Sequence, residues 1–328
     1  MSPHATGAPT RTEHATETES IVTAGQGRRR GEGRVAARRA RGAGPDRSAG
    51  RSRASTIIVT AVLVVVALYF LVPVYWLVVA STKSTGDLFS TPGFLFADFQ
   101  FVENLVRLSE QADGIFWRWM FNSLIYSGLG SILMTFISVI SGYALAMYRF
   151  RGRTVILAAA LGSMLVPQTV LAQPTYVLLV EMGLNNTMLG VLLPSLVYPF
   201  GVMLGFVYSQ TSVPMELLEA ARLDGASEWR AFWSIALKLL SPGAVTILLF
   251  AFIGSWNNFM LPLLVLSDAR LQPVTVGLSG WSQAAITVPG LQSLVIIGSL
   301  LSIIPIIVVF VSLQRYWRSG LAAGGVRF

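Results

Sequence analysis

Six long apolar runs constrain the fold of this chain more than any other feature of its sequence. Each exceeds the about 20 residues that a helix needs to cross the hydrocarbon core of a bilayer. The runs are Ile57–Ala80, Asn122–Tyr148, Thr154–Met182, Met188–Tyr208, Pro242–Leu266 and Leu291–Leu313. Since the mean hydropathy is also +0.63 over all 328 residues, we expect an all-α polytopic membrane protein with six transmembrane helices.

Basic residues are distributed unevenly around these runs. Twenty of the 24 Lys and Arg residues lie in the N-terminal tail, after the second and fourth runs, or at the C-terminus. The other four, which flank the opposite ends of the runs, are Lys83, Arg107, Arg118 and Arg270. Because basic residues are retained on the cytoplasmic side of a membrane, we expect both termini and residues 212–241 in the cytoplasm.

Residues 1–56 differ in composition from the rest of the chain. They contain eleven Arg against five acidic residues and few aliphatic side chains, so they bury too little apolar surface to fold. The apolar run that follows is longer than the hydrophobic region of a secretory signal. We expect a disordered basic cytoplasmic tail, either without a specific role or in contact with anionic lipid headgroups, before a membrane domain over residues 57–328.

Residue content excludes several kinds of active site. The chain has no Cys, and its two His residues, His4 and His14, lie in the tail. Disulfides, thiolate metal sites and Ser-His-Asp triads in the membrane domain are therefore excluded. The sequence also lacks the GxxxxGK[ST] loop that binds nucleotide phosphates. We expect a protein that is not an enzyme and binds no metal or cofactor itself, so that any ATP is hydrolysed by another chain.

The third run carries polar residues and prolines near its middle, namely Pro167, Gln168, Thr169, Gln173 and Pro174. Each proline leaves a backbone carbonyl of the preceding turn without a partner, and hydrocarbon offers none. The run is therefore expected to face protein or a water-filled cavity. Two interpretations stay open: a kinked packing helix, or a helix whose Gln168, Thr169 and Gln173 line a polar pathway.

A GxxxG pattern, Gly201 and Gly205, lies in the fourth run. Small residues at this spacing allow two helix backbones to approach closely. The pattern predicts a close helix contact and nothing more specific.

Residues 212–241 form a charged, glycine-containing segment between two apolar runs. Pro214 and Glu216 suit a first helical turn, Gly225 can adopt the positive φ that closes a helix, and Ser227 can cap the next helix. The apolar stripe of that second helix is Trp229, Phe232, Trp233, Ala236 and Leu240. The pattern predicts two short helices around a turn, which either fit a groove on a cytoplasmic partner or form an ordinary interfacial loop.

The same segment, EAARLDGASEWRAFWSIAL, resembles the EAA motif of the permease subunits of binding-protein-dependent ABC importers. The matching residues are Glu219, Ala220, Ala221, Asp224, Gly225, Ala226, Phe232, Ile235 and Leu237. Similarity to the MalG-like carbohydrate permeases of this family continues in FWRWMFNSL, YALAMYRFRG, GLNNTMLGVLLP, WNNFMLPLLVL and QRYWRSGLAAGGVRF. Lys238 departs from the proline that is usual in the family, and Asn258 from a common acidic residue.

The resemblance implies a function and a set of partners. The chain would be one permease half of an ABC importer for a sugar or oligosaccharide, in the plasma membrane of a prokaryote. Its partners would be a MalF-like permease, an ABC ATPase dimer that binds ATP and Mg, an extracytoplasmic solute-binding protein, the sugar and membrane lipid, but no nucleic acid. A permease for a non-sugar solute and a secondary transporter are alternatives, although only Glu181 offers an ionisable group within a predicted run.

The resemblance also implies roles for particular residues. The expected ATPase contacts are Glu219, Ala220, Ala221, Asp224, Gly225 and Ala226, with a second contact at the C-terminal Gly320, Gly324 and Gly325. Aromatic faces and amides suit a sugar pathway, for which the candidates are Gln168, Thr169, Gln173, Trp256, Asn257 and Asn258. For Trp256 and Trp281, anchoring at the membrane interface is the alternative interpretation.

Residues 267–290 connect the last two runs on the expected outer side. Their prolines and glycines predict an irregular loop that exposes Val274, Val276, Leu278 and Trp281. Such a loop should fold against the outer surface of the protein or against a partner. It is either a docking surface or outer gate, or a structural cap over the spans.

Overall fold

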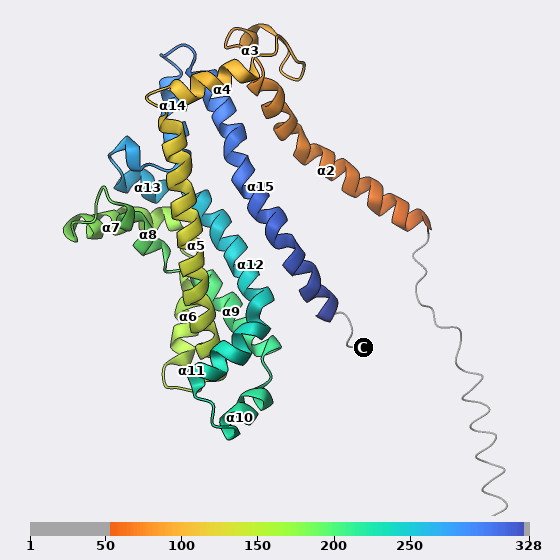
Figure 1. Cartoon of the computed structure of the whole chain (residues 1–328), viewed down its shortest axis with the longest axis vertical. Helices are drawn as coiled ribbons and strands as arrows, with labels where there is room; N and C mark the ends of the chain where they lie inside the picture. Colours follow the sequence, from red (N-terminus) through yellow and green to blue (C-terminus); the bar gives the residue numbers. More distant parts are fainter. Residues whose placement is uncertain (1–52, 325–328) are drawn as a thin grey trace, which may run out of the picture. The chain divides into compact units, whose positions relative to one another are not determined.

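The computed structural model describes the backbone of residues 53–324 and the side chains of residues 55–316 (Figure 1). Every regular element in this part of the chain is a helix, as predicted. The chain divides into two compact units, Met1–Tyr69 and Phe70–Phe328, and the boundary falls within helix α2. The expectation of a disordered tail falls almost entirely on residues 1–52, outside the described residues. The elements are α2 (Arg53–Ser81), α3 (Asp87–Ser90), α4 (Phe101–Glu110), α5 (Ile115–Met147), α6 (Arg153–Ser163), α7 (Gln168–Glu181), α8 (Met188–Ser195), α9 (Pro199–Ser212), α10 (Met215–Leu223), α11 (Glu228–Ala231), the π-helix η1 (Phe232–Ala236), α12 (Leu237–Trp256), α13 (Met260–Val265), the 3-10 helix η2 (Ala269–Leu271), α14 (Val274–Ala284) and α15 (Leu291–Gly324).

Five stretches of helix in the described part of the chain are long and apolar enough to cross a membrane, and a bent pair makes up to six. The five are Ser55–Ser81, Ile115–Met147, Met188–Ser212, Glu228–Trp256 and Leu291–Tyr316. The protein is thus a multi-pass membrane protein. The second stretch begins at Ile115 rather than at Asn122, because the less apolar turns before the predicted run continue the same helix.

The third predicted run is not a single straight helix. α6 and α7 meet at 107°, and Pro167 lies at the N-cap of α7 with φ −60° and ψ 129°. A proline ring disfavours helical conformation in the residue before it, so the chain breaks here, whereas Pro174 is accommodated inside α7. At about 1.5 Å per residue, each half is shorter than the about 30 Å of a hydrocarbon core. The continuous span expected over Thr154–Met182 is therefore replaced by a broken pair.

α5 and α9 form the largest helix contact of the second unit. A Cβ atom on Gly142 of α5 would lie 2.5 Å from the carbonyl carbon of Gly205 in α9. A Cβ atom on Gly205 would lie 2.7 Å from the carbonyl oxygen of Ser138, and Gly201 also packs against the Ser138 side chain. The close contact predicted from the GxxxG pattern is confirmed, and its partner surface on α5 is Ser138 and Gly142.

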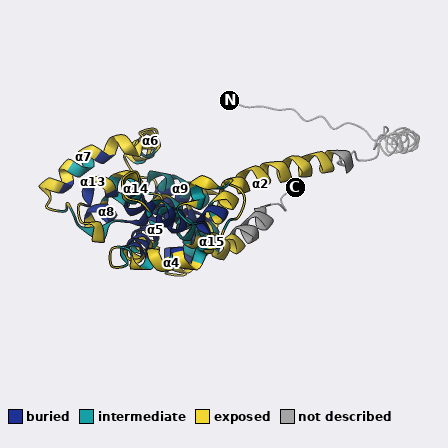
Figure 2. Cartoon of the chain, turned by 90° about the horizontal axis from the view of Figure 1, so that it is seen from above, coloured by how far each residue is buried: buried dark blue, intermediate teal, exposed yellow. Residues whose placement is uncertain are grey.

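Buried side chains gather in α5 and the helices around it (Figure 2). One hydrophobic cluster includes Phe116 and Trp119, near the start of α5, and a second includes Val139 and Tyr143, near its end. Figure 1 shows α10 and α11 at one end of this unit and α4 and α14 at the other. These ends are called the α10 end and the α14 end below, and α5 extends from one to the other.

Candidate functional site

Helix α10 has one buried face and one exposed face. Leu218 and Ala221 are buried and belong to the cluster that contains Tyr143 and Phe232. The opposite face consists of exposed residues at helical spacing, namely Glu216, Glu219, Ala220 and Leu223. Leu223 is 90% exposed, so this face of α10 presents one apolar side chain beside two carboxylates.

The turn after α10 is a Schellman motif. The amide of Gly225 donates to the carbonyl of Arg222 at 3.0 Å, and the amide of Ala226 donates to the carbonyl of Ala221 at 2.9 Å. These bonds satisfy two backbone carbonyls that have no partner within the helix. Gly225 has φ +80°, a conformation that favours glycine. Ser227 then caps α11, its hydroxyl oxygen accepting a backbone N–H at 3.3 Å. Both predictions for this turn are confirmed.

The residues expected to contact an ATPase divide between these surfaces. Ala221 faces the core and Ala226 is half-buried. The exposed ones are Glu219, Ala220, Asp224 and Gly225. A partner that docks here would therefore touch only some of the motif directly, while Ala221 supports α10 from beneath.

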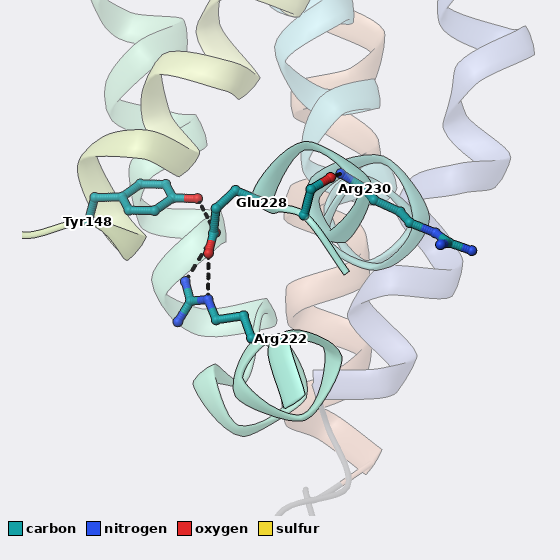
Figure 3. Close-up of polar contacts among 5 residues, drawn as sticks. Tyr148, Arg222, Glu228 and Arg230 are labelled. Carbon is teal, nitrogen blue, oxygen red and sulfur yellow. Dashed lines mark hydrogen bonds and ion pairs between the residues drawn. The ribbon is translucent and has the colours of Figure 1, made fainter. Parts of the chain in front are cut away.

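A polar contact that sequence reasoning missed joins three elements beside this turn. Glu228 Oε1 accepts from Arg222 Nε at 2.6 Å, and Glu228 Oε2 accepts from Arg222 Nη2 at 3.1 Å. Glu228 Oε2 also accepts from the hydroxyl of Tyr148 at 2.6 Å. Figure 3 shows both donors directed at the one carboxylate, whereas the Arg230 side chain extends away from it. The contact connects the end of α5 with α10 and α11.

The electrostatics of this contact keep both donors protonated. Burial raises the pKa of the Tyr148 hydroxyl, and its hydrogen bond to Glu228 raises the pKa further. The hydrogen bond to Glu228 likewise raises the pKa of the Arg222 guanidinium. Opposite charges six positions apart across a glycine turn were the only signal of the ion pair in the sequence; nothing in the sequence indicated Tyr148.

The second helix of the segment continues into α12 without a break. The π-helix η1 lies between α11 and α12. The backbone N–H of Leu237, the residue after η1, donates to the carbonyl of Phe232. Pro242, expected to begin a separate span, lies inside α12. Within the predicted apolar stripe the side chains of Phe232, Ala236 and Leu240 are buried, while those of Trp229 and Trp233 are 61% and 40% exposed. The stripe is interrupted because a π turn holds more residues than an α turn.

Side chains near the start of α5 bind the backbone of the segment that follows α13. Trp119 Nε1 donates to the carbonyl of Ala269 at 2.7 Å. Asn122 Nδ2 donates to the carbonyls of Arg270 and Gln272 at 2.8 and 3.0 Å, and the Tyr126 hydroxyl adds a bond to Leu271 at 2.9 Å. The sequence FWRWMFNSL thus supplies hydrogen-bond donors to a stretch of chain that has few backbone partners of its own.

Residues 267–290 are not the irregular loop that was expected. Val274–Ala284 forms helix α14, and Val274, Val276 and Leu278 are buried rather than exposed. Trp281 packs edge-on against Trp119 with ring centroids 4.8 Å apart. Pro273 precedes the helix at its N-cap, where its missing N–H costs nothing. Of the two surfaces expected for these residues, the protein itself or a partner, the structure shows the protein itself, and their burial favours the structural cap over an open docking loop.

Comparison with known proteins decides the family. Residues 134–321 match the family described as the binding-protein-dependent transport system inner membrane component. This match covers more than half of the chain and includes the whole segment from α10 to η1. The chain belongs to this family. The resemblance carried by the EAA motif is confirmed, and the protein is a permease component of such a transport system.

Several relatives of this permease are named for sugar transport systems. It is 33% identical over 228 residues to the arabinooligosaccharides transport system permease protein AraQ of Halalkalibacterium halodurans, which covers 69% of this chain and 79% of the relative. It is 28% identical over 251 residues to the diacetylchitobiose uptake system permease protein NgcG of Streptomyces coelicolor, covering 76% and 82%. A chain in the crystal structure of a bacterial ABC transporter involved in the import of the acidic polysaccharide alginate superimposes with a TM-score of 0.68 and 26% identity, covering 81% of this chain and 98% of that one.

The candidate pathway residues of the permease differ in how far their side chains are exposed. Those on α7, which are Gln168, Thr169 and Gln173, are exposed. Trp256 is 3% exposed and stacks on Phe252 with ring centroids 5.8 Å apart, so its side chain belongs to the core. Asn257 is exposed, although its Nδ2 donates to the carbonyl of Ile253 at 2.9 Å. Asn258 is half-buried. α7 packs against α13, which begins just after these asparagines.

The predicted contact between the C-terminus and an ATPase stays a prediction. So does the expectation that the chain binds no metal. Gly320 and Gly324 lie in the last turns of α15, where only the backbone is described, and Gly325 lies outside the described residues. Among the described residues, no three His, Cys, Asp or Glu side chains gather in a way that could hold a metal ion.

Proposed function

We propose that this permease forms one half of the translocation pathway of an ABC importer for a sugar or oligosaccharide. The observation that carries the proposal is the exposed face of α10 with its Schellman turn, which lies within the family match. The relatives are named for arabinooligosaccharides and diacetylchitobiose, and the similar structure is of an alginate importer. These three names denote linked sugars, whereas a relative 28% identical over 257 residues is named for sn-glycerol-3-phosphate; we infer an oligosaccharide as the favoured substrate class.

In this proposal the α10 end lies in the cytoplasm of a prokaryotic cell and the α14 end lies outside the plasma membrane. The loop after α5 carries Arg149 and Arg151, and Arg153 begins α6. The α10–α11 segment adds Arg222 and Arg230. Basic residues are retained on the cytoplasmic side, which supports this orientation. The proposal assigns both termini to the cytoplasm as well.

We assign one group of proposed partners to the α10 end of the permease and another to the α14 end. At the α10 end, a separate ATPase dimer binds ATP and Mg and receives the exposed face of α10, with Glu219 paired to a basic group of the ATPase. The glycine-rich C-terminus, with Gly320, Gly324 and Gly325, makes a second contact there. A MalF-like permease completes the pathway, and an extracytoplasmic solute-binding protein delivers the sugar at the α14 end. Closure of the ATPase dimer would then rock the spans between two states.

The exposed amides supply the chemistry that sugar hydroxyls require. Gln168 and Gln173 on α7 and Asn257 after α12 are exposed, and each amide both donates and accepts hydrogen bonds. These three side chains, with Thr169 and Asn258, are the proposed pathway contacts. Trp256 is buried, and for it to stack on a sugar in the pathway the surrounding core would have to rearrange.

Charge reversal at Glu219 tests the docking face. The variant Glu219→Lys should reduce co-purification of the ATPase, and the loss should depend on salt because an exposed pair is screened at high ionic strength. Glu110→Lys is the matched control, since Glu110 is also an exposed helical carboxylate but lies in α4 at the α14 end. Equal ATPase recovery from Glu219→Lys and wild type at low salt would contradict the proposed contact.

The substrate class is tested through the solute-binding protein that is proposed to deliver solute to this permease. Calorimetric titration of that protein with arabino-oligosaccharides, chito-oligosaccharides and, as the non-sugar alternative, amino acids and short peptides identifies its ligand. The assembled transporter in liposomes should then accumulate the same compound in an ATP-dependent manner. Accumulation of a non-sugar solute alone would replace the sugar assignment while leaving the importer assignment in place.

A further inference from the structure

The carboxylate of Glu228 is the only polar group in the described structure seen to join the end of α5 to both helices of the α10–α11 segment. Glu228 opens α11, Arg222 lies in the last turn of α10, and Tyr148 is the C-cap residue of α5. The two Arg222 bonds form a bidentate pair, and the Tyr148 bond shares one of the same oxygens. Charge-assisted bonds of this kind fix mutual orientation as well as distance.

The apolar contacts beneath α10 leave this orientation less strictly defined. Leu218 and Ala221 rest on a cluster of aliphatic and aromatic side chains, and hydrophobic contact is not directional. Tyr148 stands at the edge of that cluster, with its ring 6.0 Å from the ring of Tyr143. The polar contact therefore selects one orientation of α10 and α11 from those that the apolar surface would permit.

Helix α5 is well placed to carry a movement away from this contact. It is continuous over 33 residues, a length of about 50 Å at 1.5 Å per residue. At its other end, Trp119 and Asn122 hold the backbone that precedes α14. One rigid element thus contacts the α10–α11 segment at one end and the α14 cap at the other.

We propose that Tyr148, Glu228 and Arg222 are positioning residues that attach the ATPase-docking segment to α5, so that movement of that segment is passed to α5 and along it to the α14 end. The inference rests on the proposed function, because it needs an ATPase docked on α10. None of these three side chains has to touch the ATPase. Their effect is on how much transport results from each ATP hydrolysed.

Two variants weaken the contact with little change in shape, because each takes away part of its hydrogen bonding. Tyr148→Phe deletes one hydroxyl, and Glu228→Gln replaces the carboxylate by a neutral amide of the same size. Arg230→Gln is the local control, because Arg230 lies two residues from Glu228 and extends away from the contact (Figure 3). Each variant is assembled with its ATPase and partner permease in nanodiscs for ATP hydrolysis, and in liposomes for solute uptake.

We expect both contact variants to retain the ATPase on co-purification and to lower solute transported per ATP by about threefold or more, the size expected for an exposed network of this kind. Arg230→Gln should keep the wild-type ratio. A merely structural role would lower assembly and hydrolysis together and leave the ratio of transport to hydrolysis unchanged. An unchanged ratio in both contact variants would overturn the inference.

A distance measurement gives a second readout that does not depend on transport. The chain has no native cysteine, so spin labels on Leu217→Cys in α10 and Arg151→Cys after α5 are unique. In the assembled complex the distance distribution between them should broaden in Glu228→Gln and stay narrow in Arg230→Gln. An equally narrow distribution in Glu228→Gln would show that the contact does not position α10.

The two proposals fail in different ways. If Glu219→Lys leaves ATPase binding intact, the docking face is wrong, and the inference falls with it. If Glu219→Lys weakens ATPase binding but Tyr148→Phe and Glu228→Gln transport as wild type for each ATP, the docking face stands and only the inference is overturned.

Discussion

Replacing Gly142 by alanine tests how closely α5 and α9 are packed. The added methyl group would lie 2.5 Å from the carbonyl carbon of Gly205 and from the amide nitrogen of Phe206. Both are backbone atoms of a helix, so no side-chain rotation can relieve the overlap. Since non-bonded carbon atoms pack at about 3.5–4.0 Å, α9 has to move away from α5 by about 1 Å.

This movement weakens the rest of the α5–α9 contact, including the approach of Gly205 to Ser138. Overpacking of a well-packed interface costs about 1–3 kcal/mol. We expect the upper part of that range because backbone meets backbone, offset by up to about 1 kcal/mol from the higher helix propensity of alanine. A net destabilisation of about 2 kcal/mol corresponds to a fall in Tm of about 3 °C for a chain of 328 residues.

Thermal unfolding of the purified permease in detergent micelles, followed by tryptophan fluorescence, measures this change. Gly128→Ala on the same helix is the control, because a Cβ atom there meets nothing within 4 Å. The Gly128→Ala variant should unfold at or above the wild-type midpoint. A Gly142→Ala variant with the wild-type midpoint would refute the reasoning from backbone contact.

Three further substitutions address the turn and the α14 end. Gly225→Val places a β-branched residue at φ +80°, which costs about 1–3 kcal/mol; transport should be lost while membrane insertion persists, and normal uptake would contradict the role of the turn. Asn122→Ala removes the donor of the Gln272 carbonyl and leaves the Arg270 carbonyl with its bond from Arg118 Nε at 3.2 Å; it should lower stability by about 1–3 kcal/mol, with faster amide hydrogen exchange in the segment before α14 as the check. Gly277→Ala places a methyl group against the Trp119 ring and should lower Tm by several degrees through overpacking, at about 1–3 kcal/mol, unlike Gly280→Ala, which meets nothing.

Local signals in the sequence were sufficient where one or two residues decide a conformation. Gly225 and Ser227 predicted a helix end and a helix cap because positive φ and side-chain capping are properties of single residues. The GxxxG pattern predicted a close contact, but the pattern on α9 holds no information about which helix supplies Ser138 and Gly142. The long apolar runs predicted membrane helices by length alone.

Other features depend on contacts between distant residues. Pro167 and Pro174 are the same residue type in one run, yet only Pro167 breaks the helix, so local chemistry did not decide between them. The valines of α14 looked exposed because their burial requires α5 and α15 to pack beside them. Tyr148 lies 80 positions from Glu228, and only the fold brings the two together.

The direction in which α11 points relative to α12 depends on the number of residues in the π turn at Phe232–Ala236. One residue fewer there would restore an α-helix and rotate α11 by about 100° relative to α12. Glu228 would then point away from Tyr148, although no residue of the contact had changed. A related chain that is one residue shorter at this point must therefore build its own contact from different positions. Alignments across the segment pair equivalent residues only if the gap is placed inside the π turn.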